Sequence, residues 1–305
     1  MTGSLLQTQP TFSPSDEKIQ QWIRRFVWKI AIATLLLMAV GSATRVMNAG
    51  LACPDWPLCY GQLLPSQQMN LQVFLEWFHR LDASLIGIST AALVGLCWWF
   101  RKALPNWVPI ATTISLGLIF LQALLGGLTV TELLRFDIVT AHLGTALLFL
   151  GSLITIGCGL SPYQSSGSAG KLAIAGATST FLVFGQSLLG GLVASQWAVH
   201  QCLSLTQFCR VTNSHIVGVI PTTLSILLLL FFTRQTQMLN PVLRRLSWLA
   251  MGLLLEQITL GIATFRLHLQ VEPLTVAHHT LGAALFSTLL ALTIFALRDR
   301  SQYQS

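Results

Sequence analysis

Eight apolar runs, each long enough to cross a bilayer, constrain this chain more than any other feature of its sequence. A helix needs about 20 apolar residues to span roughly 30 Å of hydrocarbon. Only helices and closed barrels satisfy their backbone in lipid, and these runs do not alternate as barrel strands do, so they predict helices. The expected spans are 26–46, 77–100, 107–130, 138–160, 172–195, 213–233, 246–266 and 273–297.

Composition and charge agree with an integral membrane protein. Only 9% of the 305 residues are charged, whereas a soluble domain carries about 25%. Of the 17 Lys and Arg residues, 12 fall on one side of the expected membrane and five on the other. Because basic residues favour the cytoplasmic side, both termini are expected in the cytoplasm. The net charge of +7 then reflects membrane topology and does not indicate binding to nucleic acid.

The spans divide the chain into five parts. The first 25 residues fit neither a secretory signal nor a transit peptide, because acidic residues are present and the basic ones come late. The predicted fold class is an all-α integral membrane protein with eight transmembrane helices, arranged as two pseudo-symmetric four-helix bundles. The expected parts are a cytoplasmic N-terminal tail (1–25), an N-terminal bundle (26–160), a cytoplasmic linker (161–171), a C-terminal bundle (172–297) and a cytoplasmic C-terminal tail (298–305).

Four of the six cysteines fall in external loops, where an oxidising compartment lets disulfides persist. The simplest pairing is within each loop, Cys53–Cys59 and Cys202–Cys209, although four cysteines allow three pairings. The first pair could staple its loop or take part in redox chemistry. The other two, Cys97 and Cys158, fall inside spans and are expected to be small buried hydrophobic residues.

A fourfold repeat underlies the spans. Each odd span carries a glycine near its external end, in "LMAVGSAT", "QALLGGLT", "QSLLGGLV" and "QITLGIAT". An external loop follows, and then a span that opens on histidine. Small residues let membrane helices pack closely, which is the expected role of the glycines, while the glutamines could bond between helices or to a ligand. The residues are Gly41, Gly126, Gly190 and Gly261, with Gln122, Gln186 and Gln257 in the last three repeats.

The histidines of the repeat lie at similar depth, because all even spans run in the same direction. They are His79, His142, His215 and either His278 or His279, whereas His200 and His268 lie in external loops outside the pattern. A polar residue inside a membrane protein is costly and marks a functional site by default. Imidazole suits iron, copper and zinc, and a heme held by histidines from two neighbouring helices fits best. Two pairs predict two heme sites, one in each half.

Acidic residues distinguish the two halves. Glu76, His79 and Asp82 recur at intervals of three in "EWFHRLD" and share one helical face. No other repeat histidine has an acid three residues before it, so chemistry is expected in the first half, although the helix dipole alone could favour Glu76 at this position. Asp82 could pair with an arginine. Glu256, in the middle of a span, is expected to face protein or water.

Arginines on the external side lie near the depth of the histidines. The guanidinium group matches carboxylates in bidentate fashion, and heme carries two propionates. Arg45 and Arg80 are candidates for the first site, and Arg210 and Arg266 for the second. Each could equally be an ordinary interface anchor.

"GSATRVMNAGLACPDWPLCYGQ", followed by "EWFHR", resembles the heme A synthases, and the spans, loop cysteines and spaced histidines extend the resemblance over nearly the whole chain. It implies oxidation of the C8 methyl group of heme O to the formyl group of heme A, by successive hydroxylation and loss of water from a geminal diol. It also implies that His79 and His142 hold heme O as substrate, and that His215 and His278 hold a resident heme b. "VAHH" then favours His278 over its neighbour.

The same resemblance implies a catalytic role for Glu76 and matches Cys53 and Cys59 to the first-loop pair of the family. We expect a multi-pass protein of a bacterial plasma membrane, in contact with lipid. Its expected partners are heme O synthase (protoheme farnesyltransferase) and terminal oxidase assembly factors, and a homo-oligomer is a possible state. The alternatives are a diheme b-type electron-transfer protein, a heme carrier and a transporter built on repeats.

Overall fold

The computed structural model describes residues 13–194, 207–267 and 270–301, and the regular elements within them are helices. Eight helices of this part of the chain are long and apolar enough to cross a membrane. The chain is therefore a multi-pass membrane protein of the predicted fold class. The elements are α1 (Pro14–Val46), α2 (Leu71–Trp99), the 3-10 turn η1 (Arg101–Ala103), α3 (Trp107–Thr131), α4 (Phe136–Gly159), α5 (Gly170–Val193), α7 (Gln207–Gln235), α8 (Pro241–Arg266) and α9 (Glu272–Ser301).

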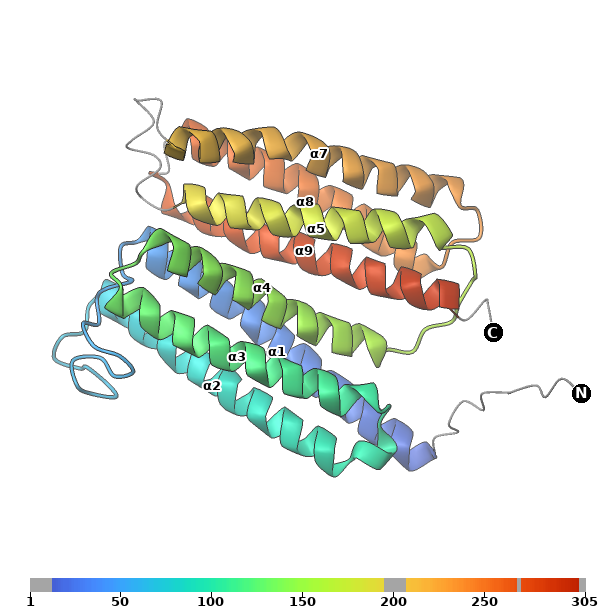
Figure 1. The fold of residues 1–305 in the computed structure, drawn as a ribbon, viewed down its shortest axis with the longest axis horizontal. Coiled ribbons are helices and arrows are strands. Elements are labelled where there is room, and N and C mark those ends of the chain that lie inside the picture. The colour runs from blue at the N-terminus through green and yellow to red at the C-terminus, as the bar shows by residue number, and fades with distance from the viewer. Residues whose placement is uncertain (1–12, 195–206, 268–269, 302–305) are drawn as a thin grey trace, which may run out of the picture.

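The helices form two rings of four. In the first ring α1, α2, α3 and α4 each pack on the next and α4 closes on α1, while α5, α7, α8 and α9 close the second ring in the same way. Figure 1 shows the rings stacked along one side, with α1 and α4 against α9, and α4 against α5. The start of α1 and the end of α9 lie at one end of the molecule, which we call the terminal end. The four repeat histidines lie near the opposite end, which we call the histidine end.

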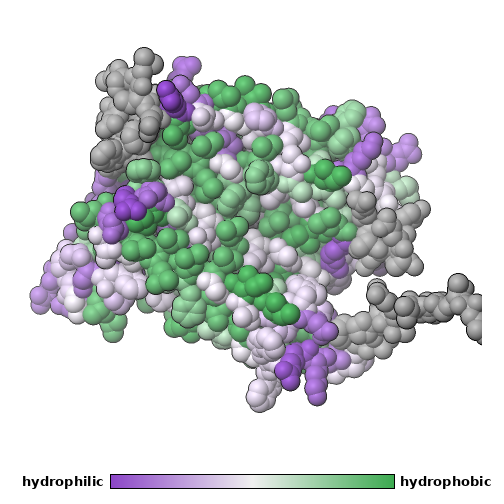
Figure 2. Space-filling model, in the orientation of Figure 1, coloured by the Kyte–Doolittle hydropathy of each residue, from purple (hydrophilic) through white to green (hydrophobic). Residues whose placement is uncertain are grey.

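The outer face of the rings is apolar. Large side chains such as Leu36, Ile88 and Phe181 are exposed along the helices. Figure 2 shows a broad hydrophobic belt on the visible face, with hydrophilic residues gathered toward the two ends. This distribution is the one that a bilayer requires.

Two helices extend beyond the expected spans. Residues 14–25, which are expected from the sequence to belong to a tail, form the first turns of α1. A capping box begins the helix, in which Ser13 Oγ accepts from the Asp16 N–H (3.3 Å) and the Asp16 carboxylate accepts from the Ser13 N–H (2.9 Å). Helix α9 likewise continues past residue 297 to Ser301. Residues 1–12 and 302–305 of the expected tails lie outside the described residues.

A buried carboxylate fixes the connection between the rings at the terminal end. Asp299 of α9 is inaccessible to solvent. Its carboxylate accepts hydrogen bonds from the Tyr163 hydroxyl (3.0 Å) and from the N–H groups of Ser166 (2.7 Å) and Ala169 (3.0 Å). Buried charges are retained where hydrogen bonds satisfy them. The predicted linker is thus held against the last turns of α9.

Candidate functional site

Each repeat histidine packs against the glycine of its own repeat. A methyl group on Gly41 would lie 2.8 Å from Cε1 of His79, and one on Gly126 would lie 3.3 Å from Cε1 of His142. The corresponding distance is 3.1 Å for Gly190 with His215 and for Gly261 with His278. The glycines therefore do more than bring helices together, because each makes room for one imidazole ring.

The paired histidines come from helices that face each other across a ring. His79 lies on α2 and His142 on α4, and each of these helices packs on both α1 and α3. Helices α7 and α9, with His215 and His278, have the same relation in the second ring. The expectation of two neighbouring helices is wrong. Neighbours in these rings run in opposite directions, so two helices that both begin at the histidine end must be diagonal.

Within each ring of helices, the two histidine side chains lie close together at the centre. The ring centroids of His215 and His278 are 6.5 Å apart, with the ring planes at 88°. His79 lies within electrostatic range of His142 in the first ring. Each ring of helices therefore directs one histidine pair toward its own axis.

The four histidines share an unmet bonding requirement. Nδ1 of each ring is buried and has no hydrogen-bond partner among the described residues, and the amide oxygens of Gln122, Gln186 and Gln257 are in the same condition. A buried polar atom without a partner costs roughly 1–3 kcal/mol. Because this cost recurs in every repeat, the pattern fits sites built for a ligand.

The donor set fits heme better than zinc. Within residues 13–194, 207–267 and 270–301, no group of three or more His, Cys, Asp or Glu side chains gathers in a way that could hold a metal ion. A zinc site takes three or four protein ligands. Heme iron needs only one or two axial ligands from the protein, so two facing histidines, apolar walls and glycine clearance suit one heme in each ring.

The structure distinguishes the two adjacent histidines of α9. His278 faces Gly261 inside the second ring. Nδ1 of His279 is hydrogen-bonded to Ser42 Oγ of α1 at 2.9 Å. His279 therefore points between the rings, and His278 occupies the position that the other three repeats give to their histidine.

The glutamines contact the second helix in each of the three hairpins that carry them. The Gln122 amide nitrogen lies 3.2 Å from His142 Nε2, and the Gln186 amide nitrogen donates to the main-chain carbonyl of His215 at 2.8 Å. The amide nitrogen of Gln257 would lie 3.1 Å from a methyl group on Gly282 of α9. All three thus pack on the histidine helix that follows them.

A disulfide-closed loop lies at the histidine end of the first ring. We call residues 47–70, between α1 and α2, the cap loop. Cys53 and Cys59 are bonded, with their Cα atoms 4.8 Å apart, which confirms the first predicted pairing. The second predicted pair, Cys202–Cys209, lies outside the side chains that the structure describes.

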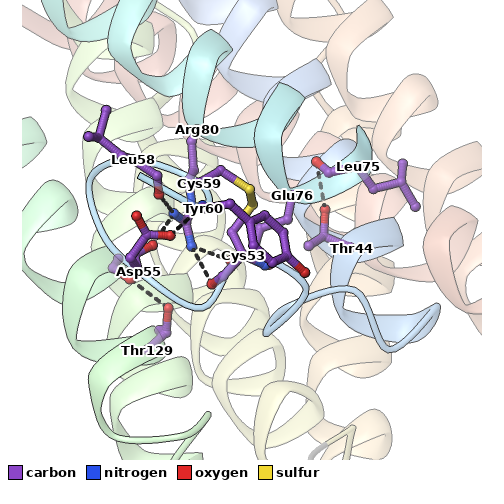
Figure 3. A network of polar contacts seen from close by, with 11 residues as sticks. Thr44, Cys53, Asp55, Leu58, Cys59, Tyr60, Leu75, Glu76, Arg80 and Thr129 are labelled. Atoms are coloured by element: carbon purple, nitrogen blue, oxygen red, sulfur yellow. Dashed lines mark hydrogen bonds and ion pairs between the residues drawn. A yellow bond between two sulfur atoms is a disulfide. The ribbon is translucent and has the colours of Figure 1, made fainter. Parts of the chain in front are cut away.

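Glu76 and Arg80 join the histidine helix to the cap loop (Figure 3). Glu76 is only 4% exposed, and its Oε2 accepts from the Cys53 N–H at 2.8 Å. Its other oxygen pairs with Arg80 Nη2. The Arg80 guanidinium also donates to the main-chain carbonyls of Asp55, Leu58 and Cys53. The candidate acid beside His79 is therefore held at both oxygens.

Asp55 closes the tip of the cap loop. Its carboxylate accepts from the N–H groups of Gly61 (2.7 Å) and Tyr60 (2.6 Å), two residues with positive φ (69° and 55°). The bond from Gly61 contributes most to holding the pKa of Asp55 below its ordinary value of 3.8. The Asp55 carboxylate therefore stabilises the folded protein above pH 3.8. This stabilisation is lost as the pH falls through the lowered pKa.

The cap loop docks on two helices. The Trp56 ring covers α3, where a methyl group on Gly127 would lie 3.2 Å from Cδ2 of the indole. The indole N–H of Trp77 on α2 donates to the carbonyl of Leu63 at 2.7 Å. Gly127 is the second glycine of "QALLGGLT" and has no role in the repeat. Its presence was the signal in the sequence that a side chain such as Trp56 packs there.

The remaining arginine candidates differ in exposure. Arg45 is half-buried on α1, within electrostatic range of His279. None of the ion pairs between described residues includes it. Arg210 and Arg266 are exposed at the histidine end. Arg45 is thus the half-buried cation that is not already engaged by the cap loop.

The other residues singled out in the sequence differ in burial. Asp82 is half-buried on α2 and belongs to none of the ion pairs of the described part. Glu256 lies on the exposed face of α8. Cys97 and Cys158 are buried free thiols, as predicted, and His200 and His268 lie outside the described residues.

Comparisons with known proteins agree with this architecture. The family COX15-CtaA, described as "Cytochrome oxidase assembly protein", matches residues 24–290. A protein of Shewanella oneidensis named "Heme A synthase" is 29% identical over 90% of this chain and 96% of its own length. Proteins of the same name from Bacillus pumilus (30% identical over 48% of each chain) and Geobacillus thermodenitrificans (35% identical over 43% of this chain and 40% of its own) match in part. The chain belongs to the COX15-CtaA family of cytochrome oxidase assembly proteins.

Proposed function

We propose that this protein is a heme A synthase, which oxidises the C8 methyl group of heme O to the formyl group of heme A. One observation carries the proposal. Two histidine pairs occupy equivalent places in the two rings, but among the described residues only the first pair has a buried carboxylate, Glu76, one helical turn away beneath a disulfide-closed loop. This asymmetry favours chemistry in one ring and a resident heme in the other.

In this proposal His79 and His142 hold heme O as substrate, and His215 and His278 hold heme b. Heme b supplies electron transfer when bound. The exposed apolar faces of the helices suit the farnesyl tail of the substrate. Arg45 is assigned to a propionate in preference to Arg80, whose donors already serve Glu76 and three loop carbonyls. Arg210 and Arg266 keep the corresponding assignment in the second ring.

Glu76 is assigned to the reacting methyl group. A carboxylate whose two oxygens are already held in place needs no reorganisation when charge develops nearby. It can stabilise positive charge that develops at the oxidised methyl carbon, or move a proton during the reaction. Arg80 and the Cys53 N–H position this carboxylate, and the cap loop keeps water from it.

The cellular setting follows from the same proposal. The protein would span a bacterial plasma membrane with both termini in the cytoplasm, so that the cap loop faces outward. Heme O synthase would deliver the substrate, and terminal oxidase assembly factors would receive the product. A homo-oligomer is compatible with the exposed helix faces.

Expression of the chain together with a heme O source, followed by extraction of the pigments, tests the proposal. We expect heme A from the wild type and none from His79→Ala. We expect Glu76→Gln to retain heme but to lower the heme A yield at least about 100-fold, the usual size of an acid–base contribution. Glu132→Gln serves as the control, because Glu132 is an exposed acid near the same end.

Three results would contradict parts of this proposal. Two reversible b-type hemes and no heme A from the wild type would indicate a diheme electron-transfer protein. Heme A from His79→Ala would reject the substrate site. A normal yield from Glu76→Gln would reject the role of Glu76 alone.

A further inference from the structure

One hydrogen bond connects the two histidine sites. Ser42 Oγ of α1 and His279 Nδ1 of α9 are 2.9 Å apart. Ser42 directly follows Gly41, which packs on the His79 ring, and His279 directly follows His278, which packs on Gly261. The bond therefore joins the wall of the first site to a ligand helix of the second.

The pseudo-symmetry of the rings supplies an internal comparison. By the order of the repeats, α4 and α5 correspond to α9 and α1, and the helices of both pairs pack together. There Leu143 directly follows His142, and Gly191 directly follows Gly190, the glycine that packs on His215. A methyl group on Gly191 would lie 2.8 Å from Cδ2 of Leu143. At this equivalent contact the rings meet through an apolar side chain and a glycine.

The comparison separates packing from orientation. An apolar contact is sufficient to bring two helices together, as Leu143 and Gly191 do. Ser42 is 8% exposed, and placing a hydroxyl and an imidazole between membrane helices is costly unless they bond to each other. What the polar pair adds is direction, because a hydrogen bond weakens steeply when its angle changes and a methyl contact does not.

We propose that the Ser42–His279 hydrogen bond couples the two sites, so that heme bound at one strengthens heme binding at the other. This inference rests on the proposed function only in requiring that both pairs bind heme. With heme bound, His278 as its ligand would hold α9 in one rotation about the helix axis. His279 lies about 100° further round the same helix, so its direction would be fixed as well. Through the hydrogen bond, His279 would hold Ser42 in one position, and with it the adjacent Gly41 that packs on the His79 ring. His279 is a positioning residue in this scheme and is not an iron ligand.

Coupling of this kind is reciprocal and measurable. Heme-free protein in detergent is titrated with hemin, and binding is followed by the Soret absorbance. His215→Ala gives the affinity of the first site alone, and His79→Ala gives that of the second. The overall constant of the wild type for two hemes, divided by the product of these two affinities, is the coupling factor. We expect a factor of about 10, within the usual range for linked sites.

Variants of the bond decide the proposal. Ser42→Ala, placed in the wild type and in each single-site variant, is expected to lower the coupling factor to about 1 while each site still binds hemin. His279→Asn keeps a nitrogen near the position of Nδ1 and should keep the factor. The double variant Ser42→Gly with His279→Leu copies the pair at α4 and α5 and should lose it. Leu143→Ala, at the apolar contact, is the matched control and should retain it.

Every other outcome counts against the proposal. A wild-type factor near 1, or an unchanged factor in Ser42→Ala, would show that the bond carries no coupling. Loss of heme from both sites in Ser42→Ala and in the double variant would make it a folding contact only. Failure of the proposed function is distinguishable, because a protein that makes no heme A can still show coupled hemin binding, whereas one that binds no hemin loses both proposals.

Discussion

Gly41 and its three counterparts lack the one carbon atom that would collide with a histidine ring. The clearances are 2.8 to 3.3 Å, whereas ordinary carbon contacts in proteins lie near 3.5–4.0 Å. The regular spacing of glycine and histidine could be recognised in the sequence as a repeat. The reason for it could not, because the sequence does not show which helix face meets which.

Gly41→Ala is expected to displace His79. The added methyl group would meet the imidazole at 2.8 Å, and overpacking of this kind costs about 1–3 kcal/mol. Hemin binding to the first site should weaken roughly tenfold, which corresponds to about 1.4 kcal/mol. The control is Gly117→Ala on α3, where a methyl group would meet nothing within 4 Å. Equal affinities in the two variants would contradict the assigned role of Gly41.

The cap loop shows what the sequence conveys at the scale of an element. The pairing of Cys53 with Cys59 could be expected from their positions. The use of Arg80 could not, because its acceptors are main-chain carbonyls of irregular backbone, and any residue type carries a carbonyl. From the sequence Arg80 was a candidate for a propionate or an interface anchor, whereas in the structure its guanidinium group bonds inside the cap loop.

Arg80→Lys is expected to loosen the cap loop. Lysine keeps the charge but cannot donate in several fixed directions as a guanidinium does. Cys53 and Cys59 are 0% and 2% exposed, so a reductant reaches their bond only when the loop opens. We expect reduction by dithiothreitol to become roughly tenfold faster, equivalent to about 1.4 kcal/mol of loop stability. Arg135→Lys, which alters an exposed ion pair, should leave the rate unchanged, and an unchanged rate in Arg80→Lys would reject this role.

For the whole molecule, the length of the apolar runs was sufficient to predict eight helices, and the fourfold repeat was sufficient to predict two bundles. Neither was sufficient to order the helices within a ring, and the expectation of neighbouring ligands was wrong for that reason. The apolar runs also do not show where α1 begins and where α9 ends. The capping box at Ser13 and the hydrogen bonds to Asp299 extend these two helices beyond their apolar runs. The contact of His279 with Ser42 joins residues 237 positions apart, so no local sequence pattern could predict it.

Orientation in the membrane is a property of the whole chain. The terminal end holds most of the Lys and Arg residues, and basic residues remain on the cytoplasmic side. We expect alkaline phosphatase fused after Ser301 to be inactive in bacterial cells, and the same reporter inserted after Gln68 of the cap loop to be active. The opposite pair of activities would reverse the assigned orientation.

The order of synthesis gives the hairpin arrangement a further meaning. Each glycine and its histidine belong to consecutive helices, so every half-site can assemble as its hairpin leaves the ribosome, and such local contacts form fast. The bond between Ser42 and His279 is different, since its partners come from α1 and α9, the first and last of the described helices. It can close only after α9 has been inserted beside α1, so it is among the last contacts between these helices to form.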